Sequence, residues 1–192
     1  MIAIINYGAG NIKSVKFAFD RIGVDAILTN NADEIKRADK VIFPGVGEAS
    51  SAMLELKKYN LDKLIPTLKQ PVLGICLGMQ LMCDYSEEGN TNCIGIFPIK
   101  VERFKTELKV PQVGWNNISN LKTNLFKDVK ENSYTYFVHS FYIPKNKYSI
   151  ADTEYDKIFT SAIKKDNFYA TQFHPEKSGD IGEQILKNFI NI

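Results

Sequence analysis

The sequence has few of the residues that mark secreted, membrane-embedded or nucleic-acid-binding proteins. Only three of its 192 residues are cysteine, an odd number without the paired spacing of metal ligands, which argues against a disulfide framework and favours a reducing compartment. No apolar run approaches the roughly 18 residues of a membrane-spanning helix, and no charged segment with a long apolar run follows Met1. The net charge of +2 gives no argument for binding nucleic acid or an anionic membrane. We therefore expect a cytoplasmic protein that binds neither.

What is present is the composition of a folded domain. The chain is 44% hydrophobic and 24% charged, as in ordinary globular proteins. Its length is sufficient to bury a real core. We find no internal repeat, no low-complexity tract and no convincing linker, and we expect one domain over residues 1–192.

Apolar runs alternate with helical patterns in the first half of the sequence. We expect strands at residues 2–5, 25–28, 41–43 and 72–75. Helices are expected at residues 12–22, 33–38, 49–59 and 61–68. This alternation predicts βαβ units and a parallel sheet.

The pattern changes after about residue 86. Runs rich in β-branched and aromatic residues predict additional, largely antiparallel strands at residues 93–101, 110–117, 133–141, 148–155, 158–163 and 168–173. A last helix is expected over about residues 181–190, with Ile181, Ile185 and Phe189 facing the core.

Two glycine-containing segments follow predicted strands. Gly8-Ala9-Gly10 lacks the third glycine of the dinucleotide fingerprint, which favours a tight strand-to-helix turn over a phosphate loop. Residues 44–48, which include Gly45, Val46 and Gly47, predict a flexible loop whose N–H groups face a ligand, or simply a turn.

Residues 72–80 are the most distinctive stretch of the chain. An apolar strand, Cys76 between Gly74 and Gly78, and the start of a helical pattern predict a strand–turn–helix with the cysteine at its apex, the geometry of a nucleophile elbow. Glycines suit the two flanking positions because strand and helix backbones approach too closely there for side chains. The helix N-terminus would favour the thiolate. The alternative is a buried structural cysteine beside two packing glycines.

A thiol nucleophile needs a base, and the sequence offers two histidines. His174 and Glu176 flank a proline, so in an extended segment both side chains point to one side and the carboxylate can orient the imidazole. The alternative is a surface loop with a solvated glutamate. His139 lies in an aromatic run without a nearby acid, which favours a core or strand-edge position.

Together these motifs resemble the class I glutamine amidotransferases. The segments that carry the resemblance are residues 74–80 and 172–176. Within that family, residues 7–11, 44–47, 111–116 and 136–140 are similar to the glutaminases of imidazole glycerol phosphate synthase, although Asn6 stands where an aspartate is commoner. The resemblance implies an α/β fold: a class I glutamine amidotransferase-like (flavodoxin-like), mostly parallel sheet flanked by helices, with additional antiparallel strands in the C-terminal half.

The resemblance also implies the chemistry. Cys76, His174 and Glu176 would form a catalytic triad that hydrolyses L-glutamine to L-glutamate and ammonia without metal or cofactor. The oxyanion hole would use the backbone N–H of Leu77 and one N–H from Gly45, Val46 or Gly47. The ends of glutamine would be held by Gln80, Glu88, Ser140 and Phe141.

A partner is implied as well. Trp115, Asn116 and Tyr136 would face a (β/α)₈-barrel cyclase/synthase subunit, which forms a heterodimer with the glutaminase and uses its ammonia in histidine biosynthesis. Read without the resemblance, Trp115 is equally well the one tryptophan of a core.

Three other functions stay open on the sequence. A stand-alone cysteine hydrolase, such as a peptidase or γ-glutamyl hydrolase, is disfavoured by residues 44–47 and 111–116. A glutaminase serving another synthase, for example in sugar amination for surface polysaccharides, is not excluded. A pseudo-glutaminase with a structural or regulatory role is disfavoured by the intact set of Cys76, His174 and Glu176.

Overall fold

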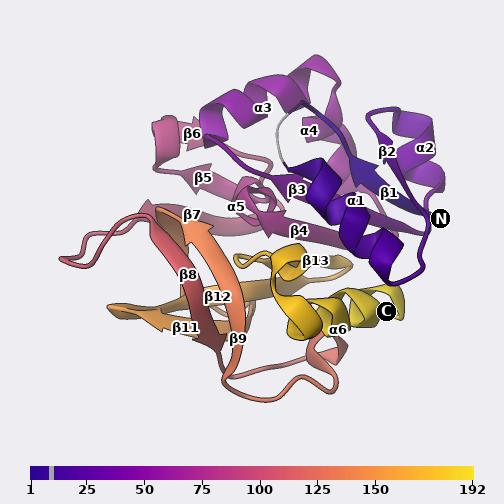
Figure 1. The fold of residues 1–192 in the computed structure, drawn as a ribbon. Coiled ribbons are helices and arrows are strands. Elements are labelled where there is room, and N and C mark those ends of the chain that lie inside the picture. Colours follow the sequence, from indigo (N-terminus) through magenta and orange to yellow (C-terminus); the bar gives the residue numbers. More distant parts are fainter. Residues whose placement is uncertain (9–10) are drawn as a thin grey trace.

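The computed structural model describes residues 1–8 and 11–192, and a large mixed sheet runs through it (Figure 1). The strand order is β2-β1-β3-β4-β13-β12-β10-β7-β5-β6, with β11 paired to β12 outside this path. A separate two-stranded sheet is formed by β8 (Gln112–Ile118) and β9 (Ser133–His139). Among the described residues, no helix is long and apolar enough to cross a membrane.

The first half has the expected alternation of strands and helices. Its strands are β1 (Ile2–Ile5), β2 (Ala26–Thr29), β3 (Lys40–Gly45) and β4 (Val72–Cys76), and they pair in parallel. Its helices are α1 (Ile12–Arg21), α2 (Ala32–Arg37), α3 (Ala49–Lys58), α4 (Leu61–Leu64) and the 3₁₀ turn η1 (Ile65–Thr67). The turn expected at Gly8, Ala9 and Gly10 includes residues outside the described part of the chain.

Strand β3 is longer than expected, and here the sequence-based boundary was wrong. Pro44 and Gly45 continue the strand and pair with Ile75 and Cys76 of β4. The proline is tolerated because β1, the other neighbour of β3, pairs only as far as Ile42, so no ladder hydrogen bond is lost on that side. The strand therefore delivers Val46 directly beside the end of β4.

The second half adds mostly antiparallel strands. These are β5 (Cys83–Ser86), β6 (Thr91–Asn92), β7 (Phe97–Arg103), β10 (Phe141–Pro144), β11 (Ser149–Tyr155), β12 (Lys157–Lys165) and β13 (Phe168–Thr171). The run expected as one strand over residues 133–141 divides at Ser140 into β9 and β10. Strand β13 is antiparallel to β12 but parallel to β4, so it joins the two halves of the sheet.

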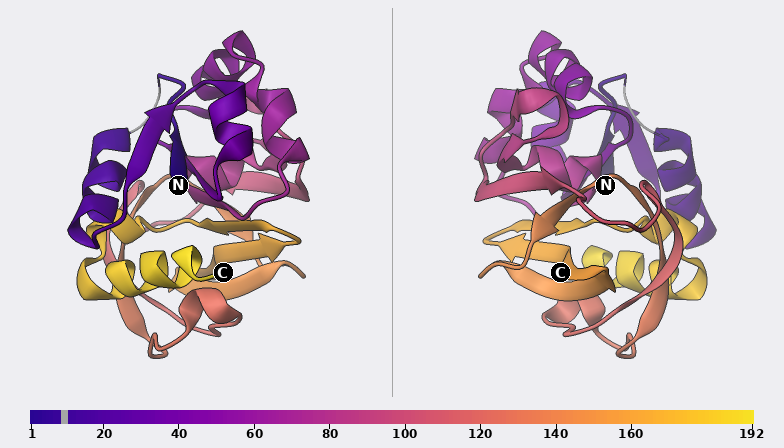
Figure 2. Two further views of the ribbon diagram at one scale, coloured as in Figure 1. Left: turned by 90° about the vertical axis from the view of Figure 1, so that its right-hand side faces the viewer. Right: turned by 90° about the vertical axis from the view of Figure 1, so that its left-hand side faces the viewer.

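Helices cover both faces of the sheet, and the strands between them are buried on both sides. Along β1, Ala3 and Ile5 pack in one apolar cluster, whereas Ile2 and Ile4 pack in the other. Helices α3 and α4 cover the first cluster. The second is covered by α1 and α6 (Gly179–Ile190), and Figure 2 shows α6 on the side opposite α3 and α4. Burial on both faces explains the continuous apolar runs of these strands.

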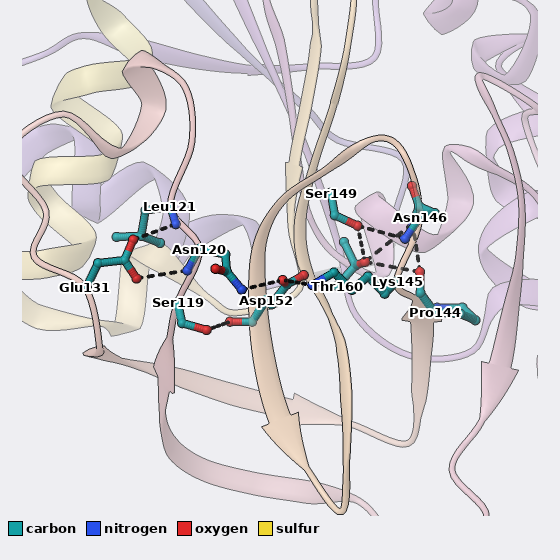
Figure 3. A network of polar contacts seen from close by, with 10 residues as sticks. All are labelled: Ser119, Asn120, Leu121, Glu131, Pro144, Lys145, Asn146, Ser149, Asp152 and Thr160. Carbon is teal, nitrogen blue, oxygen red and sulfur yellow. Dashed lines mark hydrogen bonds and ion pairs between the residues drawn. The ribbon is translucent and has the colours of Figure 1, made fainter.

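A polar network around the buried Asp152 attaches the β8–β9 connection to β11 (Figure 3). The Asp152 carboxylate is buried; it accepts a hydrogen bond from Asn120 Nδ2 at 2.9 Å and pairs with Lys145 Nζ at 2.8 Å. The backbones of Ser119 and Asp152 exchange two hydrogen bonds of 2.8 Å. Glu131 accepts from the backbone N–H groups of Asn120 and Leu121, each at 2.9 Å. The small sheet is thereby held against the large one.

Candidate active site

Cys76 stands at the apex of a strand–turn–helix, as the sequence predicts. It ends β4 and precedes α5 (Leu77–Leu81), with φ of 54° and ψ of −110°. A left-handed φ is costly for a residue with a side chain and persists where the surrounding structure enforces it. Gly78 permits the tight turn, because a Cβ at that position would lie 1.9 Å from the carbonyl oxygen of Phe43 in β3 and would force the two backbones apart. At Gly74 a Cβ would lie 3.1 Å from Ala170 Cβ and Met82 Sδ, which is tight but less severe.

His174 and Glu176 form a buried pair, which excludes the solvated surface loop. His174 Nδ1 lies 2.8 Å from Glu176 Oε1. The local geometry differs from the expected extended segment: His174 is extended, but Glu176 lies in the 3₁₀ turn η4 (Pro175–Lys177). The turn is fixed at its end by Ser178 Oγ, which donates to the His174 carbonyl. A tight turn, rather than strand alternation, therefore brings the two side chains together.

The pair is tuned by its surroundings. Burial lowers the pKa of His174, but hydrogen bonds and charge interactions with Cys76 and Glu176 outweigh it and raise the pKa to about 10. The imidazole therefore favours its cationic form beside the Cys76 sulfur and the Glu176 carboxylate. This arrangement supplies a nucleophile and a proton donor together.

A cavity of about 310 Å³ opens over Cys76 and His174. Seven other residues expected at the site line it: Val46, Gly47, Leu77, Gln80, Glu88, Ser140 and Phe141. Gly45 does not line the cavity; it lies in β3, where an added Cβ would meet the Gly78 backbone N at 2.8 Å and the Tyr7 hydroxyl at 2.9 Å. Pro111, Val138, His139 and Lys177 also line it and were not expected there.

Two glutamines and one carbonyl connect the cavity wall to the sulfur. Gln80 Nε2 donates to the Phe141 carbonyl and to Gln172 Oε1, each at 2.9 Å. Gln172 Nε2 in turn lies 3.7 Å from Cys76 Sγ. Sequence reasoning did not assign Gln172, although it lies two residues before His174 in the motif that carried the family resemblance.

Glu88 approaches the cavity from the other side. Its Oε2 accepts a hydrogen bond of 2.9 Å from the backbone N–H of Ala49, the first residue of α3. Burial raises the pKa of Glu88, and the hydrogen bond from Ala49 opposes that shift. The carboxylate is thus fixed in place at the cavity rim.

His139 is a buried histidine of β9, as expected, but it also faces the cavity. Its Nδ1 donates to the Phe141 carbonyl at 2.7 Å, and its Nε2 lies 2.9 Å from the Gln112 side-chain amide. Burial lowers its pKa to about 4, although the hydrogen bond to Phe141 opposes the shift. His139 is therefore neutral near pH 7 and lacks the acidic partner that His174 has.

The outer face of the β8–β9 sheet is aromatic and exposed. Trp115 is 56% exposed, which excludes the core position considered from the sequence. It pairs with Tyr136 across the ladder, with ring centroids 5.9 Å apart. Asn116 alternates to the other face, where its Nδ2 donates to the Glu154 carbonyl at 2.8 Å. The exposed face thus contains Trp115 and Tyr136 but not the Asn116 side chain.

The sequence matches the model of the family described as Glutamine amidotransferase class-I over residues 3–192. It is 56% identical to the Imidazole glycerol phosphate synthase subunit HisH of Bacteroides fragilis strain YCH46, over 100% of this chain and 99% of that protein. The subunit of the same name from Haemophilus influenzae strain KW20 is 48% identical, over 98% of this chain and 96% of that protein.

Solved structures share the fold. A crystal structure of a glutamine amidotransferase superimposes with a TM-score of 0.78 at 14% identity, covering 100% of this chain and 98% of the other. The structure of PurLQS from Thermotoga maritima gives a TM-score of 0.74 at 13% identity, covering 99% of this chain and 97% of the matched one.

Proposed function

We propose that this chain, which belongs to the class I glutamine amidotransferase family, is the glutaminase subunit of an imidazole glycerol phosphate synthase. It hydrolyses L-glutamine to L-glutamate and supplies the ammonia to a cyclase in histidine biosynthesis. The observation that carries the proposal is the buried pair of His174 and Glu176 beside Cys76, whose left-handed backbone presents its sulfur to a cavity.

The reaction uses these three side chains in two stages. The Cys76 thiolate attacks the side-chain amide carbon of glutamine, and His174 gives its proton to the leaving ammonia. Glu176 orients the imidazole through the 2.8 Å contact and stabilises its charge. The glutamyl thioester is then hydrolysed by water that His174 activates as a base.

The tetrahedral intermediates need donors for their oxyanion. We assign the backbone N–H of Leu77, at the start of α5, and one N–H from residues 45–47. Val46 and Gly47 line the cavity, which supports their part in this hole. Loss of one such donor typically costs about 10²–10³ in rate.

The cavity walls fit the two ends of glutamine. The Glu88 carboxylate suits the α-amino group, and Ser140 suits the carboxylate end. Gln80 lines the cavity, but its NH₂ group already donates to the Phe141 carbonyl and to Gln172, so only its amide oxygen is free to meet substrate. The Phe141 carbonyl already accepts from Gln80 and His139, which fills its two lone pairs. Phe141 therefore orients Gln80 rather than receiving substrate through its carbonyl oxygen.

The partner surface follows from the exposed face of the β8–β9 sheet. We propose that Trp115 and Tyr136, with the exposed Val113 and Tyr134, dock a (β/α)₈-barrel cyclase subunit in a heterodimer. Val113 pairs with Val138, which lines the cavity, so this face adjoins the active site. Contact here would let ammonia pass to the partner before water protonates it.

The loop after β3 suits partner-dependent activity. Gly47 has a φ of 96° with no atom near its Cβ direction, and Val46 is exposed. Because glycine adopts such conformations at little cost, the peptides here can exchange between orientations that aim a carbonyl or an N–H at the oxyanion site. A partner that binds the N–H-in orientation more tightly shifts the equilibrium toward it. Moving the equilibrium from 1:99 to 99:1 takes about 5.5 kcal/mol of differential binding free energy.

The test measures steady-state glutamine hydrolysis by the purified chain, alone and with a candidate cyclase and its ligand. We expect low activity alone, strong activation by the cyclase, and no activity in Cys76→Ser with either. A diazoketone analogue of glutamine should label Cys76 alone, because burial raises the pKa of Cys83 and raises that of Cys93 to about 12. Full activity in isolation, or labelling of Cys83 or Cys93 instead, contradicts the proposal.

A further inference from the structure

Gln172 is a buried polar residue that directly contacts the reactive sulfur. Its side chain has no exposed surface, and it follows directly after β13. Its backbone N–H donates to the Ser161 carbonyl at 2.8 Å, which extends the β12–β13 pairing and fixes the side chain's origin. From there Nε2 reaches to 3.7 Å from Cys76 Sγ.

The orientation of the Gln172 amide follows from its neighbours. The Phe141 carbonyl can only accept, so Gln80 must present its NH₂ group to it. The second hydrogen of that NH₂ then points at Gln172, whose amide oxygen accepts it, with Gln80 Nε2 and Gln172 Oε1 2.9 Å apart. The NH₂ group of Gln172 is therefore the part that faces Cys76.

Cys76 Sγ has a second polar neighbour with the opposite preference. The Val138 carbonyl oxygen lies 3.6 Å from the sulfur and accepts a hydrogen bond from the neutral thiol. A thiolate has no hydrogen to give and gains nothing there. The two contacts thus oppose each other: Val138 favours the thiol, whereas the Gln172 NH₂ favours the thiolate.

We propose that Gln172 is a fixed hydrogen-bond donor that stabilises and positions the Cys76 thiolate, with Gln80 and the Phe141 carbonyl setting its orientation. The proposal rests on the assignment of Cys76 as the nucleophile. It adds to the triad a second donor to the sulfur, besides His174. A neutral amide cannot take the proton, so Gln172 acts on the charge and place of the sulfur and not as an acid or base.

The experiment measures alkylation of Cys76 by iodoacetamide as a function of pH, with each cysteine quantified by mass spectrometry. Gln172→Met has similar length but no donor, and Gln172→Glu keeps an acceptor for Gln80 while placing a carboxylate toward the sulfur. We expect the pH of half-maximal alkylation to rise by about one unit in Gln172→Met, a tenfold loss of thiolate below that midpoint. The rise should be larger in Gln172→Glu.

A matched control is Gln70→Met, because the Gln70 side chain is also hydrogen-bonded, to the Ile35 carbonyl at 2.8 Å, but lies outside the cavity. This variant should keep the parent's midpoint. Circular dichroism of all variants separates an altered sulfur from an unfolded chain.

A second measurement needs no substitution. In the parent chain, labelled with ¹⁵N, the side-chain NH₂ resonances of Gln172 should move with pH at the same midpoint as Cys76 alkylation. If both Gln172 variants are folded and keep the parent's midpoint, the inference is wrong. If neither variant folds, the inference is refuted when the Gln172 NH₂ resonances of the parent chain do not change over the pH range in which Cys76 titrates. Failure of the proposed function gives a different result, since Cys76 would then react no faster than Cys83 or Cys93.

Discussion

Gly78→Ala should damage the active site through the backbone of a neighbouring strand, without removing any functional group. The added Cβ would lie 1.9 Å from the Phe43 carbonyl oxygen. Carbon and oxygen in close contact normally keep roughly 3.3 Å apart, so the two backbones must separate by about 1.4 Å. The movement falls on β3, whose next residues lead into the proposed oxyanion loop at Val46 and Gly47, and on α5, which begins at Leu77.

The size of the effect follows from that displacement. A shift of about 1 Å at a reacting group can lower the rate on the order of 10²-fold. Overpacking a close contact typically lowers the free energy of unfolding by about 1–3 kcal/mol. We expect kcat/KM for glutamine, measured with the proposed cyclase partner, to fall about 100-fold. The free energy of unfolding, from urea titration, should fall by about 1–3 kcal/mol.

Two glycines serve as controls. Gly23 follows α1 with a φ of 74° and no atom within 4 Å of an added Cβ, so Gly23→Ala should lose about 1–2 kcal/mol of stability while kcat/KM is unchanged. Gly74→Ala, with contacts of 3.1 Å, should fall between the two in activity. If Gly78→Ala folds and stays within about twofold of the parent in kcat/KM, the close approach of β3 and α5 is not what positions the site.

Other substitutions test the remaining parts of the molecule. His174→Ala should lower kcat by at least about 10²-fold, whereas His139→Ala should stay within about tenfold and act on KM or stability; steady-state kinetics decides, and equal losses would contradict the assigned roles. Because the folded-state pKa of His174 is raised to about 10, its stabilising contribution is complete below pH 6.5 and is lost as pH rises toward 10; in Glu176→Gln, urea unfolding at several pH values should show that loss at lower pH. Asp152→Asn removes the charge of a buried carboxylate that pairs with the exposed Lys145, and it should lower the free energy of unfolding by about 1–3 kcal/mol. It should leave kcat/KM intact, and a matching loss of activity would show that this network reaches the site.

Much of the parallel half of the fold is readable from the sequence. The continuous apolar runs of β1 and β4 reflect strands buried on both faces, and the intervening helices follow from apolar spacing. The position of β13 is not readable in this way. It pairs with β4, which lies nearly a hundred residues earlier in the chain. The local pattern of apolar and polar residues does not indicate which distant strand a segment will pair with. The extension of β3 through Pro44 was missed for a related reason, because its tolerance depends on where β1 stops pairing.

The site residues that could be predicted from the sequence are likewise those whose contacts are local in the chain. Cys76 and Gly78 act through the backbone of their own turn, so their spacing alone indicates the elbow. His174 and Glu176 are two residues apart and were paired correctly, although by a 3₁₀ turn instead of an extended segment. Gln172 could not be assigned, because its side-chain contacts come from Cys76 at the end of β4 and Gln80 of α5, far away in the sequence. His139 was expected to be buried, but its place in the cavity wall was missed because β8 and β9 pair across residues distant in sequence, which brings Gln112 to its ring.

Strand β9 joins the proposed partner surface to the reacting groups. The Tyr136 ring lies on the exposed face beside Trp115, while its backbone carbonyl accepts the His174 N–H at 2.9 Å. Two residues later, the Val138 carbonyl lies 3.6 Å from Cys76 Sγ. A partner bound to this face therefore contacts a strand whose carbonyls are hydrogen-bonded to the backbone of His174 and lie beside the sulfur of Cys76. Since the neutral thiol is the form that Val138 favours, a small displacement of β9 away from the sulfur would favour the thiolate. The proposed activation by a cyclase would thus have a second physical route, besides the loop at Gly47, that requires no large rearrangement of the subunit.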